Sequence, residues 1–194
     1  PADFASPKEA IEAGIGMVQQ HFSLVNKMTV LDNIILNLKG NSFFLDRAAA
    51  RKKLTDLAEK YGLHVNPDAL ISDLSVGEQQ RVEILKALYR DVELLILDEP
   101  FSALDPLVKR EMQFELLLLQ KKLKKTVIFI THDINEAFKL GDTVAIMKDG
   151  EIIQIDTPEN MASNPADEYV EKFIDSADKT KILSAKHVMI TPTC

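Results

Sequence analysis

Two stretches, LSVGEQQR at residues 74–81 and LLILDEP at residues 94–100, decide the expected fold of this chain. The first joins a glycine-containing turn to a helix, and the second is an apolar strand that ends in two carboxylates. Nucleotide-handling α/β folds use this order to place acidic groups beside bound phosphates. The two stretches therefore predict an α/β fold with an acidic site at the carboxyl edge of a parallel sheet.

The phosphate-binding loop that usually accompanies such a site is absent from the sequence. Its pattern, GxxxxGK followed by serine or threonine, supplies backbone N–H groups that wrap the anion and a lysine that reaches the terminal phosphates. None of the seven glycines is followed by lysine. We therefore expect the chain alone to hold a nucleotide weakly.

The composition is that of an acidic globular chain. Its 194 residues are 46% hydrophobic and carry a net charge of −7, which allows a substantial core and gives no overall attraction to nucleic acid or anionic lipid. The only cysteine, Cys194, rules out an internal disulfide and favours a reducing compartment. No stretch reaches the ~20 apolar residues of a membrane helix. No secretory signal is visible, and the start at Pro1 is typical of a fragment or a processed chain.

Helices and strands are expected to alternate along the chain. The apolar runs predict strands at residues 15–18, 92–97 and 126–130, of which the last two are expected to be buried and the middle one central and parallel. The Asp149-Gly150 turn predicts an antiparallel hairpin of residues 143–147 and 151–155. Polar capping residues predict helix starts at Ser6, Ser75, Asp105, Asp133, Thr157 and Asn164, and the spacing of apolar residues predicts two more helices at residues 29–36 and 46–61.

Four motifs, in this order, resemble those of ATP-binding cassette (ABC) ATPase domains. They are the signature (residues 74–81), Walker B (94–100), the D-loop (102–105) and the H-loop (131–133). The segment VQQHF at residues 18–22 resembles the Q-loop, with Gln20 as the aligned glutamine. The resemblance implies a P-loop NTPase-like ABC ATPase core with a mostly parallel sheet and a helical subdomain, truncated at the N-terminus.

The resemblance implies catalytic roles for Gln20, Glu99 and His132. Glu99 would be the general base that deprotonates the attacking water, and His132 would hydrogen-bond the γ-phosphate of ATP. Gln20 would contact Mg²⁺ or the water and link the nucleotide state to the helical lobe. Asp98, at the end of its strand, can hold Mg²⁺ through water. The missing loop would be Walker A, so independent ATPase activity is expected to be weak or absent.

The signature turn (residues 74–78) would act on a second ATPase domain. Ser75, Val76, Gly77 and Glu78 would contact the γ-phosphate of an ATP held mainly by that domain in a head-to-tail dimer, because a helix N-terminus attracts anions. Asp105 would lie at the dimer seam. Val76 stands where the family usually has glycine, and Glu78 replaces a common glutamine. The backbone N–H of Val76 is still available, so the site is expected to be retained.

Each motif also has a purely structural interpretation. Acidic residues before Pro100 can simply begin a loop, and Thr131 to Asp133 can cap a helix beside a solvated His132. Ser75 and Glu78 match a capping box, a role that can coexist with phosphate binding.

The two halves of the chain resemble different importer subfamilies. Residues 6–33 and 75–90 resemble sugar or nucleoside importer ATPases, whereas residues 101–113 resemble those of glycine betaine and other osmoprotectants. A mosaic origin is therefore a hypothesis. Residues 1–178 are expected to form a partial ABC ATPase domain with a helical subdomain near 28–90. The tail at 179–194 is expected to begin a CBS domain, which residues 183–189 resemble.

The expected function is that of the ATP-binding and hydrolysing subunit of an importer. Such a subunit binds ATP and Mg²⁺, docks on transmembrane permease subunits and works at the cytoplasmic face of the cell membrane, without nucleic acid. A non-transport ABC ATPase of DNA repair or ribosomes is an alternative, although the chain shows no heptad run or basic arm. Another alternative is an inactive fragment that only donates its signature turn to a partner.

Overall fold

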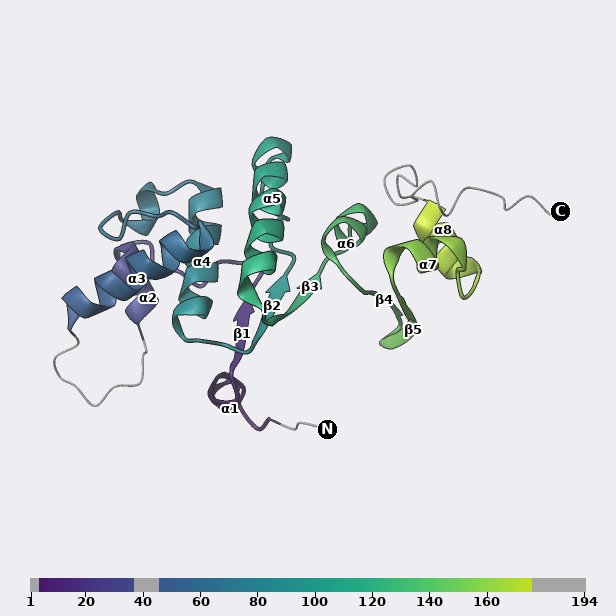
Figure 1. Ribbon diagram of the computed structural model, residues 1–194, viewed down its shortest axis with the longest axis horizontal. Coiled ribbons are helices and arrows are strands. Elements are labelled where there is room, and N and C mark those ends of the chain that lie inside the picture. Colours follow the sequence, from purple (N-terminus) through teal and green to yellow (C-terminus); the bar gives the residue numbers. More distant parts are fainter. Residues whose placement is uncertain (1–3, 37–45, 176–194) are drawn as a thin grey trace. The chain divides into compact units, whose positions relative to one another are not determined.

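The computed structural model describes residues 4–36 and 46–175 and divides the chain into two compact units, Pro1–Ile130 and Thr131–Cys194 (Figure 1). The sequence of residues 39–42 is typical of a loop; this segment and the CBS-like residues 183–189 lie outside the described residues. No helix in the described ranges is both long and apolar enough to cross a bilayer.

A three-stranded parallel sheet forms the centre of the first unit (Figure 1). Its order is β1 (Ile15–Val18), β2 (Leu94–Asp98) and β3 (Thr126–Ile130), with Val18 opposite Leu97 and Leu97 opposite Phe129. The prediction of a central, parallel strand after the signature helix is confirmed. All three strands therefore end at one edge of the sheet, where Gln20 and Glu99 follow them.

The two faces of this sheet differ in burial. Leu95 and Leu97 on one face are 1% and 0% exposed, whereas Ile128 and Ile130 on the other face of β3 are 45% and 44% exposed. The prediction that β3 is buried on both faces is therefore wrong for the described structure. Its apolar sequence resembles that of a doubly covered strand, but the helices of the first unit bury only alternate side chains.

Helix starts in the first unit agree with the predicted ones. Side chains of Ser6, Thr29, Asp46, Ser75 and Asp105 each accept a backbone N–H at a helix start, and Gly62 ends its helix with φ +75°. Glycine reaches this left-handed region without strain. The elements are α1 (Pro7–Glu12), α2 (Val30–Ile35), α3 (Arg47–Tyr61), the short 3₁₀ helix η1 (Ile71–Asp73), α4 (Val76–Tyr89) and α5 (Pro106–Leu123).

Helices α2, α3 and α4 pack against one another. Leu31 and Ile34 of α2, Leu54 of α3 and Leu85 of α4 are at most 1% exposed. Burying a leucine or isoleucine side chain contributes about 1.5–3 kcal/mol. This is the packing that a helical subdomain requires, and its boundaries near residues 28 and 90 stay a prediction.

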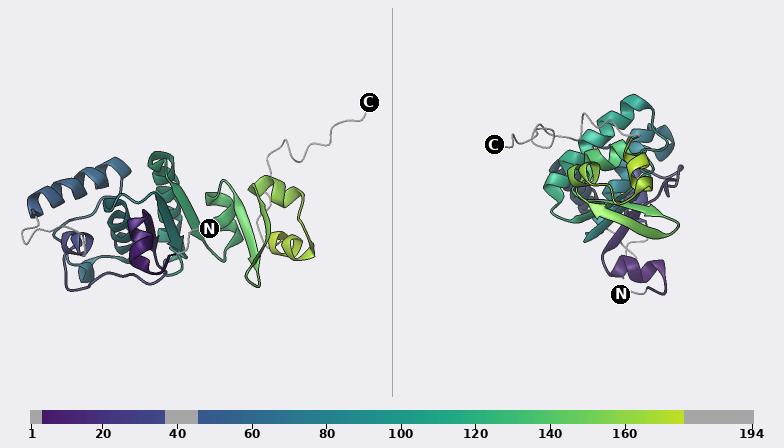
Figure 2. Two further views of the ribbon diagram at one scale, coloured as in Figure 1. Left: turned by 90° about the horizontal axis from the view of Figure 1, so that it is seen from below. Right: turned by 90° about the vertical axis from the view of Figure 1, so that its right-hand side faces the viewer.

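The described part of the second unit, residues 131–175, contains a hairpin and three helices. Strands β4 (Val144–Lys148) and β5 (Glu151–Asp156) pair antiparallel around Asp149 and Gly150, which confirms the predicted hairpin. Figure 2 shows the hairpin with α7 (Pro158–Ser163) and α8 (Glu168–Asp175) against it. A buried cluster of five apolar side chains joins them: Val144, Ile146, Met161, Val170 and Ile174.

The start of α8 differs from the prediction. The sequence predicts a helix that is capped by Asn164 and begins at Pro165, but α8 begins at Glu168. Asp167 accepts the N–H of Val170 at 2.8 Å. An aspartate cap therefore replaces the predicted asparagine cap, because Asp167 offers the same side-chain acceptor closer to the apolar positions of the helix.

Candidate functional site

Glu99 adopts an unusual backbone conformation directly after β2. Its φ of +42° lies in the left-handed region, which costs a non-glycine residue about 1–3 kcal/mol and is typical of functional sites. Its N–H donates to the carbonyl of Ile130 at 2.9 Å, and its own carbonyl accepts from the N–H and the hydroxyl of Ser102 at 3.1 and 3.0 Å. The turn that carries the Glu99 side chain is thus fixed by main-chain contacts.

Gln20 and Glu99 meet at the carboxyl edge of the sheet. The amide Nε2 of Gln20 donates to Oε2 of Glu99 at 3.2 Å. The two residues are 79 positions apart, and they come together because β1 and β2 are parallel neighbours. The structure therefore brings together two of the three predicted catalytic side chains, whose catalytic roles stay predictions.

The predicted metal ligands, Asp98 and Gln20, supply oxygen atoms, which are the ligands that Mg²⁺ prefers. Asp98 is the last residue of β2, is partly buried and directly precedes Glu99. Within the described ranges, no group of three or more histidine, cysteine and acidic side chains is arranged for a metal. Mg²⁺ keeps several waters and commonly needs only one or two protein oxygens plus phosphate. The Asp98 carboxylate and the Gln20 amide oxygen suit such an ion.

Ser75 and Glu78 form the predicted capping box at the N-terminus of α4. The Ser75 N–H and hydroxyl donate to Glu78 Oε2 at 2.9 and 2.7 Å, and the Glu78 N–H donates to Ser75 Oγ at 3.4 Å. The Ser75 hydroxyl, followed by its backbone N–H, holds the pKa of Glu78 below its ordinary value. The structural role of Ser75 is therefore confirmed, and a phosphate would have to compete with Glu78 for its hydroxyl.

The first turn of α4 packs closely on α5. A Cβ on Gly77 would lie 3.1 Å from Cγ1 of Val108, so glycine permits this approach. Val76 beside it is 40% exposed and available to a partner. Arg81 and Glu115 then join the two helices through paired bonds, Nε to Oε2 at 2.9 Å and Nη2 to Oε1 at 2.7 Å. The signature turn is thus fixed on a rigid pair of helices.

Asp105 begins α5. Its Oδ1 accepts the N–H groups of Leu107 and Val108 at 3.0 and 3.2 Å, with Pro106 at the first helical position. The predicted cap is confirmed, and the position of Asp105 at a dimer seam stays a prediction.

His132 belongs to the second unit, where it is exposed two residues after β3 ends. Thr131 donates to Glu136 at 2.6 Å and accepts the N–H of Asp133 at 3.1 Å. Asp133 in turn caps α6 (Ile134–Leu140) by accepting the N–H of Asn135 at 3.0 Å. The backbone on both sides of His132 is therefore ordered by its neighbours, which confirms the predicted helix cap.

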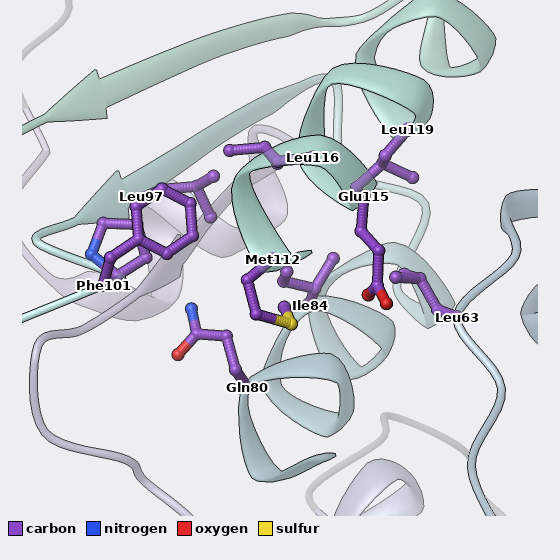
Figure 3. Close-up of a pocket in the computed structure, with 10 residues that line it drawn as sticks. Leu63, Gln80, Ile84, Leu97, Phe101, Met112, Glu115, Leu116 and Leu119 are labelled. Carbon is purple, nitrogen blue, oxygen red and sulfur yellow. The ribbon is translucent and has the colours of Figure 1, made fainter. Parts of the chain in front are cut away.

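Gln80 occupies a narrow, mostly apolar gap between α4, α5 and the turn after β2. It is 1% exposed, and within the described structure its Nε2 has no hydrogen-bond partner. Figure 3 shows its amide directed into the gap, between Phe101 and Met112. A buried amide without a partner costs about 1–3 kcal/mol.

Replacing Gln80 with methionine is expected to stabilise the chain. Methionine has similar length and volume and needs no hydrogen bond, so Gln80→Met should raise the free energy of unfolding by about 1 kcal/mol. Gln79→Met is the matched control, because Gln79 Nε2 donates to the Leu74 carbonyl at 3.0 Å. Denaturant titration should show opposite shifts of the two midpoints. Equal destabilisation would show that Gln80 has a partner.

Sequence reasoning missed the polar contacts that hold the segment after Gln20. Glu83 accepts the Ser23 N–H at 2.6 Å, Lys86 donates to the Ser23 carbonyl at 2.8 Å, and Asn33 bonds both backbone groups of Val25 at 2.7 and 3.1 Å. Burial raises the pKa of Glu83, although Lys86 and the Ser23 N–H oppose the rise. The available signal in the sequence was Glu83 itself, a charged residue within the apolar run of the buried helix α4.

Comparison with known proteins places these features in one family. Residues 2–102, which include the Q-loop-like segment, the signature turn and Glu99, match the sequence profile described as "ABC transporter". The solved structure of cbiO1 from Clostridium perfringens, described as part of the ABC transporter complex cbiONQ, is similar at a TM-score of 0.68 and 28% identity. That similarity covers 90% of this chain and 69% of cbiO1.

Curated relatives are named as transport ATP-binding proteins. The trimethylamine N-oxide protein TmoW of Ruegeria pomeroyi is 45% identical over 93% of this chain and 53% of its own length. The glycine betaine protein OpuAA of Bacillus subtilis is 43% identical, over 94% of this chain and 43% of its own length. The chain thus spans about half the length of the curated relatives it matches. The match of residues 2–102, more than half of the sequence, shows that the chain belongs to the ABC transporter family.

Proposed function

We propose that this chain is part of the ATP-binding and ATP-hydrolysing subunit of an ABC importer. The observation that carries the proposal is the 3.2 Å contact between Gln20 and Glu99 at the carboxyl edge of the parallel sheet. It joins two family motifs that lie far apart in sequence, at the edge where open α/β sheets bind ligands. The names of the relatives, which are transport ATP-binding proteins, support the same function.

Glu99 and Gln20, at the carboxyl edge of the sheet, activate and orient the attacking water. Glu99 accepts a proton from the attacking water, and Gln20 orients that water or contributes its amide oxygen to Mg²⁺. Asp98 would hold the ion, and His132 would donate a hydrogen bond to the γ-phosphate. The ion, when bound, neutralises phosphate charge. The protein contributes mainly charge and position, as phosphoryl transfer requires.

The signature turn serves an ATP held mainly by a second ATPase domain. The backbone N–H groups of Val76 and Gly77 and the hydroxyl of Ser75 lie at the N-terminus of a 14-residue helix. Such a terminus attracts anions. ATP then closes the two domains head to tail, with Asp105 at their seam, and hydrolysis reopens them.

The helical lobe transmits this motion to membrane permease subunits at the cytoplasmic face. The names of the relatives indicate small zwitterionic solutes, glycine betaine and trimethylamine N-oxide, as the class transported. Their matches extend over more than nine-tenths of this chain and so span both sides of Pro100. The mosaic hypothesis requires separate comparisons of residues 1–99 and 101–194 to favour different subfamilies; agreement on one subfamily would reject it.

A role limited to donating the signature turn is the second candidate. The observation that favours it is a signature helix with intact caps, which orders the turn without a nucleotide in this chain. A function in DNA repair or on ribosomes is not favoured, because the matched relatives are transport proteins.

An ATP titration separates these functions. The chain is titrated with ATP and Mg²⁺ alone and with an ATPase subunit that contains a GxxxxGK-type loop, and binding and association are measured. We expect weak binding alone and ATP-dependent association with the partner. Tight ATP binding and hydrolysis by the chain alone would reject the donor-only role, whereas no association with ATP would reject a role of the signature turn in the dimer.

Glu78→Gln is expected to strengthen the ATP-dependent association. Glutamine at this position can retain the capping contact with Ser75 and removes a negative charge beside the phosphate site. Removing about 1 kcal/mol of repulsion between Glu78 and the phosphate lowers the dissociation constant of the ATP-dependent complex roughly fivefold in the titration above. Glu59→Gln on α3 is the control for the change in net charge alone. An equal gain in affinity in Glu59→Gln would contradict a local effect of Glu78 at the signature turn.

A further inference from the structure

Two side chains of α4 hold both backbone groups of Ser23. Oε1 of Glu83 accepts the Ser23 N–H at 2.6 Å, and Nζ of Lys86 donates to the Ser23 carbonyl at 2.8 Å. Nζ of Lys86 also lies 3.9 Å from Oε2 of Glu83. We call these three residues the Ser23 clamp. It fixes the position and the orientation of one peptide segment relative to the helix.

The clamp places a carboxylate where burial opposes its charge. Glu83 is 5% exposed, and its neighbours Val82, Ile84 and Leu85 are buried apolar residues. An apolar side chain at this position would avoid the desolvation cost of a buried carboxylate. The short bond to Ser23 and the nearby charge of Lys86 are the compensation that the structure shows for it.

The clamp connects the signature helix to the contact at the sheet edge. On one side, Glu83 lies about two turns after Ser75 on the same helix. On the other side, Ser23 follows Gln20 by three residues, and Gln20 Nε2 donates to Glu99 Oε2 at 3.2 Å. Gln19 Oε1 also accepts from the Ser23 hydroxyl at 3.4 Å, which ties this segment together.

We propose that Glu83 is a positioning residue that sets the place of Gln20 relative to Glu99 by gripping Ser23. A displacement of α4, such as one caused by a partner's nucleotide at the signature turn, then moves Gln20 as well. The signature turn, which serves a partner's ATP, is thereby connected to Glu99, the general base in the same chain as the turn. This inference rests on the proposed function for its catalytic meaning, but its structural part can be tested without ATP.

The structural part is tested on the chain as it stands with Glu83→Ala and Glu83→Gln. Glutamine keeps an oxygen acceptor for Ser23, whereas alanine removes it. We expect amide exchange at Ser23 to accelerate about tenfold or more in Glu83→Ala and to stay close to wild type in Glu83→Gln. The NMR signals of the Gln20 side-chain amide should shift in the alanine variant only. Unchanged Gln20 signals in Glu83→Ala would overturn the proposal.

Lys86→Met provides a second variant in case Glu83→Ala does not fold. It removes the bond to the Ser23 carbonyl and leaves Glu83 in place, so a smaller shift of the Gln20 signals is expected. No shift in a folded Lys86→Met protein would also overturn the proposal.

The catalytic part is tested in a version extended upstream of residue 1 by a strand and a GxxxxGK-type loop, called the loop-extended version. Glu83→Ala should lower kcat about tenfold with KM for ATP within about twofold, because a misplaced orienting group affects the reacting geometry more than nucleotide affinity. Glu83→Gln should restore kcat to within about threefold of the unsubstituted version. An equal loss in both variants, or no loss in Glu83→Ala, would overturn the positioning role.

The two proposals fail in different ways. A loop-extended version that binds no ATP, while Glu83→Ala still shifts the Gln20 signals, would reject the proposed function and support the clamp. Normal ATP hydrolysis with Gln20 signals unaffected by Glu83→Ala would support the function and reject the clamp.

Discussion

Glu99→Gln is expected to abolish ATP hydrolysis in the loop-extended version while leaving ATP-driven dimerisation intact. A glutamine cannot accept the proton of the attacking water, and loss of a general base costs about 10²–10⁴ in rate. The binding geometry should survive. The Glu99 turn is held by main-chain bonds to Ile130 and Ser102, and a glutamine oxygen can still accept the bond from Gln20. The measurement is phosphate release beside dimerisation by sedimentation or light scattering.

Glu93→Gln is the matched control for this prediction. Glu93 lies just before β2, at the opposite end from Glu99, and its side chain is 80% exposed beside Lys125. The same chemical change there should leave the rate of hydrolysis within about twofold of that of the unsubstituted version, because surface substitutions usually have small effects. Turnover that is unchanged in Glu99→Gln would reject Glu99 as the base. Loss of dimerisation together with turnover would show instead that the carboxylate is needed for nucleotide binding.

Local sequence chemistry was sufficient to predict most element boundaries. Asp46 and Asp105 each accept two backbone N–H groups at the helix starts where the sequence places them, and Gly62 ends α3. Caps are predictable because donor and acceptor lie within three residues of each other. The exception is α8, where Asp167 caps the helix in place of the predicted Asn164, three residues earlier.

Contacts between distant residues were not predictable from composition or periodicity. Glu83 and Ser23 are 60 residues apart, and the charged residue in the apolar run of α4 does not indicate which distant segment it binds. The contact of Gln20 with Glu99 was expected only through the family resemblance, which assigns both residues to one site. The left-handed φ of Glu99 has no local signal either, because it is imposed by the bonds of its turn to Ile130 and Ser102.

Leu97→Ala is expected to destabilise the first unit strongly. Leu97 is 0% exposed and lies opposite Val18 and Phe129 in the central strand, so truncation leaves a cavity that the two neighbouring strands cannot easily close. Leucine-to-alanine changes in such positions cost about 2–5 kcal/mol, a large share of the roughly 5–15 kcal/mol by which domains are stable. Chemical denaturation followed by circular dichroism measures the loss.

Ile128→Ala tests whether the two faces of the sheet differ as the structure indicates. Ile128 belongs to the neighbouring strand and opposes Ile96, but it is 45% exposed, so its truncation removes less buried area and should cost less than about 1.5 kcal/mol. The ratio of the decreases in the free energy of unfolding in Leu97→Ala and Ile128→Ala therefore shows which face of the sheet is covered. Equal, large losses would mean that Ile128 is as buried in solution as Leu97. In that case β3 would be covered on both faces, as its continuous apolar sequence predicts.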